Sequence, residues 1–305
     1  MYRNYDEIVA AVKKSAVKRT MAVAGAGDMP VIEAALHAQK ENIAEPIFTG
    51  DAAKIRELLR QKDANPSDYN IVNAAAGAEA QAAVELVKDG SANLLMKGLI
   101  ETRDMLRPVV SKENDLRTGK LMSHVVFFGN LPRYDKLIVS TDGGMVMYPT
   151  LEDKVGIIEN AVDTMLRMGY EKPKVAVLCA IEFVNPKMKE SVEAAELKRM
   201  NQEGIIKNCV VEGPISYDIA MDASIARHKG FDCPYCGDFD ILIVPDMNAG
   251  NILGKSWIVT GGALMGGIIV GAKAPIVLTS RGSSAEEKFY SIALAALTAS
   301  GSASR

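Results

Sequence analysis

The residues best placed to do chemistry lie in one stretch near the C-terminal end. It reads Ala274-Pro-Ile-Val-Leu-Thr-Ser280-Arg281-Gly282-Ser283-Ser284-Ala-Glu286-Glu287-Lys288, a pattern that predicts a strand, a turn and a helix. The stretch combines a hydroxyl donor, a guanidinium that can bind phosphate bidentately, the positive end of a helix dipole, and carboxylates that could act as a base. The alternative is an ordinary turn with a capping box, Ser283 to Glu286 or Ser284 to Glu287.

A second group of polar residues follows the strand-like run Asn93–Met96. Lys97 and Gly98 come first, and a Lys at the end of a strand can point into a cleft. Arg103 and Arg107 are four residues apart, so they share one face of the predicted helix. Three cations near one strand end suit an anionic ligand, whereas a solvated helix face is the alternative.

Three further polar segments adjoin predicted strands. Ser123 and His124 precede Val-Val-Phe-Phe, and the turn Thr141-Asp142-Gly143-Gly144 follows another apolar run. Pro245-Asp246-Met247-Asn248-Ala249-Gly250-Asn251 crowds an Asp, two Asn and a Gly before an apolar helix. Turn chemistry explains such residues one at a time, and a lone His in an apolar strand is often a core residue. Turn chemistry explains less well why four such residues crowd together at 245–251, so a ligand site is favoured there, whereas the turn at Asp142 could hold a ligand or simply close its strand.

Strand-like and helix-like stretches alternate along the chain, which predicts an α/β protein with largely parallel sheets. In open sheets of this type, ligands bind beyond the carboxyl ends of the strands, where most of these polar segments fall, although Ser123 and His124 precede a predicted strand. The predicted strands are Met21–Ala24, Pro46–Thr49, Asn93–Met96, His124–Phe128, Lys136–Ser140, Lys174–Leu178, Cys209–Val211, Ile241–Val244 and Pro275–Thr279. The predicted helices include Ala34–Gln39, Ala52–Gln61, Glu79–Lys88, Lys154–Met168, Pro186–Asn201 and Ile219–Arg227.

Two short motifs have competing interpretations. Gly25-Ala26-Gly27-Asp28 follows a strand but lacks the third glycine of a dinucleotide fingerprint, so a tight turn between strand and helix is favoured. Cys233-Pro-Tyr-Cys236 has the spacing of a redox pair, but it precedes a strand and has no second cysteine pair for zinc. We expect a loop with two incidental cysteines, with a metal or redox role as the alternative.

Size and charge narrow the function classes further. A chain of 305 residues suits two domains of ordinary size. The net charge of −3 and the scattered Lys and Arg residues argue against nucleic-acid binding. No apolar stretch is long enough to span a membrane, and the first residues lack the apolar core of a signal peptide. We therefore expect a soluble cytoplasmic protein without membrane partners.

Taken in order, these segments resemble the phosphate acyltransferases, the family of phosphate acetyltransferase and phosphate butyryltransferase. The resemblance covers residues 96–287, and the total length is similar to that of the shorter butyryl-type members. The matching positions are Met96-Lys97-Gly98, Thr102, Arg107-Pro108, Ser123-His124, Asp142-Gly143, Pro245-Asp246-x-Asn248-x-Gly250-Asn251, Lys273-x-Pro275 and Ser280-Arg281-Gly282.

The resemblance implies reversible transfer of a short acyl group, butyryl in preference to acetyl, between coenzyme A and inorganic phosphate. It implies a ternary complex without a covalent intermediate, coenzyme A as substrate, no permanently bound cofactor or metal, and a homodimer or higher homo-oligomer. The implied fold is like that of isocitrate dehydrogenase. It has a first domain at 1–133 plus 271–305, a second at 134–270, and the active site between them.

The resemblance also assigns roles. Ser280 and Arg281 match the residues that contact the reacting groups, and Glu287 matches the proposed base. Acetyl-type members carry Asp at that position, so Glu286 is an alternative base. The implied substrate-binding residues are Lys97, Thr102, Arg107, Ser123, His124, Asp142, Asp246, Asn248, Gly250, Asn251 and Gly282.

Two other functions compete with acyl transfer. An NAD(P)-dependent hydroxy-acid dehydrogenase of related fold would need a metal-binding Asp cluster or a convincing nucleotide fingerprint, and the sequence has neither. A non-catalytic acyl-CoA-binding protein would keep the coenzyme A site while lacking the Ser-Arg pair and the acidic residue, which this chain retains.

Overall fold

The structure is a computed structural model that describes residues 1–15, 17–280 and 282–299. The chain divides into two compact units. We call Tyr5–Lys120 with Gly266–Arg305 the terminal unit, and Met1–Asn4 with Leu121–Met265 the central unit. The domain boundaries expected from the sequence, the likeness to isocitrate dehydrogenase and the active site between the domains stay predictions.

The terminal unit is built on strands in the order β3-β2-β1-β4-β11-β10. All neighbouring pairs among β3, β2, β1, β4 and β11 are parallel, and β10 pairs antiparallel with β11. The C-terminal segment therefore supplies the neighbour of β4. The strands are β1 (Thr20–Ala24), β2 (Glu45–Gly50), β3 (Asn70–Asn73), β4 (Leu94–Lys97), β10 (Leu264–Val270) and β11 (Ile276–Val277).

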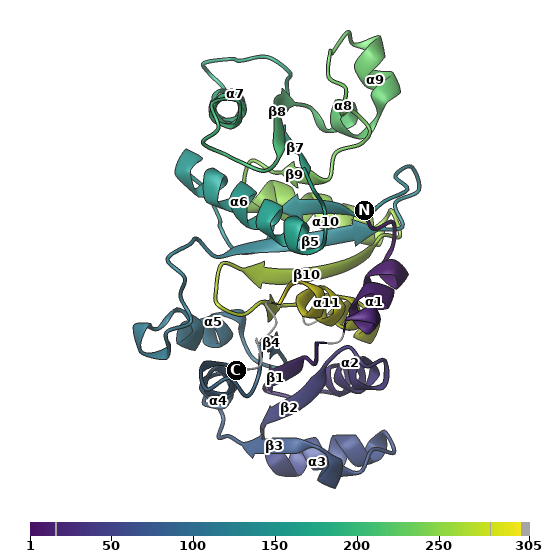
Figure 1. The fold of residues 1–305 in the computed structure, drawn as a ribbon, viewed down its shortest axis with the longest axis vertical. Coiled ribbons are helices and arrows are strands. Elements are labelled where there is room, and N and C mark those ends of the chain that lie inside the picture. Colours follow the sequence, from purple (N-terminus) through teal and green to yellow (C-terminus); the bar gives the residue numbers. More distant parts are fainter. Residues whose placement is uncertain (16, 281, 300–305) are drawn as a thin grey trace. The chain divides into compact units, whose positions relative to one another are not determined.

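Helices cover both faces of this sheet. In Figure 1, α4 and α5 lie on one side of the strands, and α1, α2 and α11 lie on the other. The apolar side chains of α11 account for the burial, since Phe289, Ile292 and Leu294 are all buried. The helices are α1 (Tyr5–Lys14), α2 (Met29–Lys40), α3 (Ala52–Gln61), α4 (Glu79–Lys88), α5 (Thr102–Val110) and α11 (Ala285–Thr298), with short 3-10 turns at Pro66–Asp68 and Lys112–Asn114.

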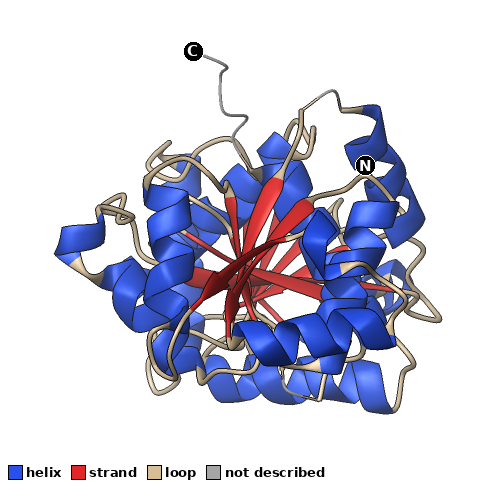
Figure 2. Cartoon of the chain, turned by 90° about the horizontal axis from the view of Figure 1, so that it is seen from below, coloured by secondary structure: helices blue, strands red, loops and turns tan. Residues whose placement is uncertain are grey.

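The central unit has strands in the order β5-β6-β9-β7-β8. Strands β6, β9, β7 and β8 are parallel, while β5 pairs antiparallel with β6. Figure 2 draws the strands in red and the helices in blue. The elements are β5 (Ser123–Gly129), β6 (Ile138–Thr141), β7 (Lys174–Leu178), β8 (Val210–Ile215), β9 (Ile241–Ile243), α6 (Leu151–Arg167), α7 (Lys189–Gln202), α8 (Tyr217–Met221), α9 (Ala223–His228) and α10 (Met247–Val259).

The predicted α/β class with largely parallel pairing is confirmed. One predicted helix, Ile219–Arg227, is instead two short helices, because Asp222 ends α8 and caps α9 by accepting from the amide of Ser224. The strand β10 was not predicted, since its sequence Leu-Met-Gly-Gly-Ile-Ile-Val contains two glycines, which weaken strand propensity.

Candidate active site

The ends of three parallel strands bring the loops of the terminal unit to one edge. Ala24 of β1 pairs with Lys97 of β4, and Met96 pairs with Val277 of β11. The loops after β1 and β4 are bonded directly, because the amide of Gly98 donates to Ala24 O at 2.8 Å. A Cβ atom at Gly98 would lie 2.3 Å from the carbonyl oxygen of Gly25, so this approach requires glycine.

Lys97 is buried at the end of β4, with 5% of its surface exposed. Its Nζ donates to the carbonyl oxygens of Ile100 at 3.1 Å and Gly98 at 3.3 Å. Thr102 is half-buried at the start of α5, and Arg107 is exposed in the last turn of that helix. Lys97 therefore supports the loop that leads into α5, whereas Arg107 is accessible to an anionic ligand.

The Ser280 turn follows β11 at the same edge. Ser280 is exposed, its carbonyl oxygen accepts from the amide of Ser283 at 3.1 Å, and its hydroxyl accepts from the amide of Gly282 at 3.4 Å. The predicted residue Arg281 lies outside the described residues. Gly282 is exposed, and a Cβ there would meet no described atom within 4 Å.

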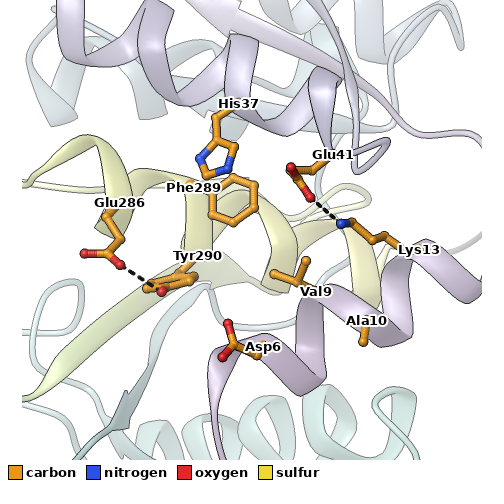
Figure 3. A pocket seen from close by; sticks show the side chains of 9 residues that line it. All are labelled: Asp6, Val9, Ala10, Lys13, His37, Glu41, Glu286, Phe289 and Tyr290. Carbon is orange, nitrogen blue, oxygen red and sulfur yellow. Dashed lines mark hydrogen bonds and ion pairs between the residues drawn. The ribbon is translucent and has the colours of Figure 1, made fainter.

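The two candidate bases point to different surroundings. Glu287 closes a capping box with Ser284 at the start of α11, as the alternative interpretation of the sequence anticipated. Glu286 instead accepts a hydrogen bond from Tyr290 Oη at 2.9 Å. It lines a cavity of about 410 Å³ beside α1 and α2, where Figure 3 shows His37 stacked on Phe289. Of the two carboxylates, only that of Glu287 is hydrogen-bonded to a residue beside the Ser280 turn, namely Ser284.

Strand ends also gather the predicted residues of the central unit. Thr141 of β6 pairs with Ile243 of β9, so the loops after these parallel strands share an edge. They touch closely, since a Cβ atom at Gly250 would lie 2.8 Å from Gly143 Cα. Asn251 Nδ2 donates to the carbonyl oxygen of Gly143 at 3.4 Å. The start of β5 reaches the same edge because β5 runs antiparallel to β6.

Asp142 organises this edge. The residue is 2% exposed, and its carboxylate accepts from three backbone amides: Met145 at 2.7 Å, and Gly144 and His124 at 2.8 Å. Three such donors hold the carboxylate in one orientation. A Cβ atom at Gly144 would lie 2.4 Å from Nδ1 of His124, so the glycine makes room for the imidazole.

The remaining predicted residues differ in accessibility. Asp246 caps α10 by accepting from the amide of Ala249 at 2.9 Å, and Asn248 and Asn251 are exposed in the first turns of that helix. Ser123 is completely buried, and its hydroxyl accepts from Nδ2 of Asn160 at 2.9 Å. The sequence drew no attention to Asn160, because an Asn inside a helical pattern carries no signal of a long-range contact.

The cysteines lie elsewhere in the central unit. Burial raises the pKa of the Cys233 thiol and raises that of Cys236 to about 12, which disfavours thiolate chemistry at neutral pH. Among the described residues, no three His, Cys, Asp or Glu side chains gather as a metal site would require. None of the described helices is long and apolar enough to cross a membrane.

Comparison with known proteins identifies the family. The family model described as phosphate acetyl/butaryl transferase matches residues 71–296. This chain belongs to that family. It is 43% identical to phosphate butyryltransferase of Clostridium acetobutylicum over 300 residues, covering 98% of this chain and 99% of that protein. It is 41% identical to phosphate acetyltransferase of Thermotoga maritima over 281 residues, covering 92% and 95%.

A solved structure of the same kind supports membership in the phosphate acetyl/butyryl transferase family. The branched-chain phosphotransacylase from Enterococcus faecalis superposes with a TM-score of 0.80 at 34% identity, covering 92% of this chain and 98% of that one. The family assignment predicted from the ordered motifs is therefore confirmed. The roles of individual site residues stay predictions.

Proposed function

We propose that the protein transfers a short acyl group, butyryl in preference to acetyl, between coenzyme A and inorganic phosphate. The observation that carries the proposal is the near-complete alignment with phosphate butyryltransferase, 98% of this chain and 99% of the relative. The chain also retains the Ser280-Arg281-Gly282 turn ahead of α11. Acyl-CoA and phosphate are then its substrates, and coenzyme A is not a resident cofactor.

The proposed chemistry begins at the thiol of coenzyme A. A thiol with a pKa of about 8.5 and an ordinary Glu at about 4.3 differ by about 4 units, or about 6 kcal/mol of unfavourable proton transfer. The positive end of α11 and a nearby guanidinium narrow this gap because both stabilise a thiolate. We propose Glu287 as the base. Its reciprocal hydrogen bonds with Ser284 hold it next to the Ser280 turn.

The bond changes follow from that proton transfer. The sulfur attacks the carbonyl carbon of the acyl phosphate, and Ser280 and the first amides of α11 donate to the developing oxyanion. The bond from carbon to the phosphate oxygen then breaks, and phosphate leaves with the electron pair. We propose that Arg281 neutralises the charge on that leaving group, since a guanidinium can bind phosphate with two hydrogen bonds.

We propose that Lys97, Thr102 and Arg107 bind substrate at the edge of the terminal unit. The exposed Arg107 supports this role for the helix α5. In the central unit we propose the same role for the polar edge around Asp142. Its accessible members are His124, Asp246, Asn248 and Asn251, and we propose that the buried members Ser123, Asp142 and Gly250 hold this edge in place. We also propose that the protein is cytoplasmic and forms a homodimer or higher homo-oligomer; light scattering on the purified protein tests the oligomeric state.

The experiment that tests the function is a thiol-release assay with inorganic phosphate and acetyl-, propionyl- or butyryl-CoA. We expect release that requires phosphate, needs neither metal nor nicotinamide, and is fastest with butyryl-CoA. Binding of acyl-CoA without release would instead indicate a binding protein. Oxidation of a hydroxy acid with reduction of NAD(P) would indicate the dehydrogenase, the alternative that the family match argues against.

A further inference from the structure

Lys288 occupies a position that folding alone does not favour. It lies in the first turn of α11, where the helix dipole repels a cation, and only 3% of its surface is exposed. Burying an ammonium group removes it from water at a cost in stability. Burial accordingly lowers the pKa of Lys288, an effect that the negative charges of Asp28 and Glu287 oppose in part.

The hydrogen bond made by Lys288 shows which part of the molecule the buried ammonium group stabilises. Its Nζ donates to the carbonyl oxygen of Ser283 at 2.6 Å. Ser283 is itself buried, and its amide donates back to the carbonyl oxygen of Ser280 at 3.1 Å. Its neighbour Ser284 caps α11. The ammonium group is thus hydrogen-bonded to Ser283, the residue that joins the Ser280 turn to the N-cap of the helix.

We propose that Lys288 is a positioning residue for the phosphate-binding turn, which it holds through the carbonyl group of Ser283. The inference rests on the proposed function, in which Ser280 and Arg281 contact the reacting groups. A charge-assisted hydrogen bond is stronger and shorter than a neutral one, so it holds the turn in one conformation before phosphate arrives. Such pre-organisation appears as phosphate affinity, because less ordering remains to be done on binding.

The test compares Lys288→Met with a control variant, Lys62→Met. Lys62 is an exposed lysine that pairs with Glu33, and both residues are far from Lys288 in the sequence. In Lys288→Met we expect the KM for phosphate to rise about tenfold or more, while the KM for butyryl-CoA changes by less than about twofold. The concentration of inorganic phosphate that is needed for a given rise in melting temperature should increase by a similar factor. Lys62→Met should match the wild type in all three measurements.

The outcomes separate this inference from the proposed function. Absence of phosphate-dependent thiol release in the wild type would contradict the function itself. With an active wild type, an unchanged phosphate KM in Lys288→Met, or an equal rise for both substrates, would overturn the positioning role. Lys288→Gln, which keeps a donor without the charge, serves if the Met variant does not fold, and failure of both to fold would assign Lys288 to folding and overturn the proposal.

Discussion

Glu287 and Ser284 cap each other at the start of α11. The Ser284 hydroxyl accepts from the amide of Glu287 at 3.1 Å, and the Glu287 carboxylate accepts from the amide of Ser284 at 3.0 Å. This reciprocal pair needs only an acceptor at Glu287, and Gln supplies one as well as Glu does. Capping and base catalysis by Glu287 can therefore be separated by a single substitution.

We predict that Glu287→Gln is as stable as the wild type but has a much lower kcat. The capping box survives, so the free energy of unfolding should change by less than about 0.5 kcal/mol, whereas loss of the base should lower kcat by about 10²–10⁴-fold. The measurements are kcat at saturating substrates and the midpoint of urea unfolding. Glu286→Gln is the matched control, with a nearly normal kcat, and the reverse pattern would move the base to Glu286.

We predict that Arg281→Lys is not a conservative change. A lysine cannot reproduce the bidentate geometry of a guanidinium on phosphate. Loss of that charge-assisted contact should lower kcat/KM by about 10–100-fold, which corresponds to about 1.4–2.8 kcal/mol. Steady-state kinetics with varied phosphate give the value, with the melting temperature as a check on folding. Kinetics equal to those of the wild type would remove Arg281 from the site.

We predict that Gly250→Ala loosens the edge of the central unit. The added Cβ would lie 2.8 Å from Gly143 Cα and 2.9 Å from Val244 Cγ2, and backbone cannot yield as easily as a flexible side chain. Overpacking of this kind costs about 1–3 kcal/mol. Lys255→Ala, on the exposed face of the same helix, should change stability by less than about 0.5 kcal/mol. Equal urea midpoints for both variants would show that the loops separate without cost.

We predict that Glu193→Gln changes how stability depends on pH. Burial raises the pKa of Glu193, but hydrogen bonds from Lys154 and Lys189 outweigh it and hold the pKa below its ordinary value. The carboxylate therefore stabilises the fold above the unfolded-state pKa of about 4.3, and this contribution is lost as pH falls through the lower folded-state pKa. In Glu193→Gln, the part of the acid-induced loss of stability that comes from this carboxylate should disappear.

The same substitution should also lower stability near neutral pH. Lys154 is 3% exposed and donates to Glu193 at 2.7 Å, so removing the carboxylate leaves a buried ammonium without its counter-charge. Breaking a buried pair in this way costs about 3–5 kcal/mol. Urea unfolding from pH 8 down to about pH 2, which extends below the lowered folded-state pKa of Glu193, tests both effects. Glu190→Gln, an exposed change on α7, should follow the wild type throughout.

The site was predictable from the sequence where it depends on strand ends. Asp142 and Gly250 follow different predicted strands, and parallel pairing of β6 with β9 brings their loops together. Orientation within one turn was not predictable. The sequence offers two equally spaced capping boxes, Ser283 with Glu286 and Ser284 with Glu287. Only the structure shows that the second one forms, while Glu286 accepts from Tyr290 instead.

Burial was equally hidden from the sequence. Lys288 belongs to an apparently ordinary polar run, and nothing in its neighbours' residue types shows that its ammonium lies under the Ser280 turn. Ser123 illustrates the same difficulty, since a Ser beside a His suggests an accessible hydroxyl, yet Asn160 from α6 covers it. The Asn160 contact comes from a helix that is distant in sequence, whereas the Lys288 contact is local and only its burial was hidden.

The insertion of β11 next to β4 has a consequence for how the chain is made. Leu94, Leu95 and Met96 of β4 are fully buried, but the strand that completes their hydrogen bonding is synthesised about 180 residues later. Until then, a growing chain on the ribosome presents an apolar sheet edge that other nascent chains can extend. Nonsense mutations between residues 97 and 276 should therefore leave insoluble fragments, however intact the preceding sequence.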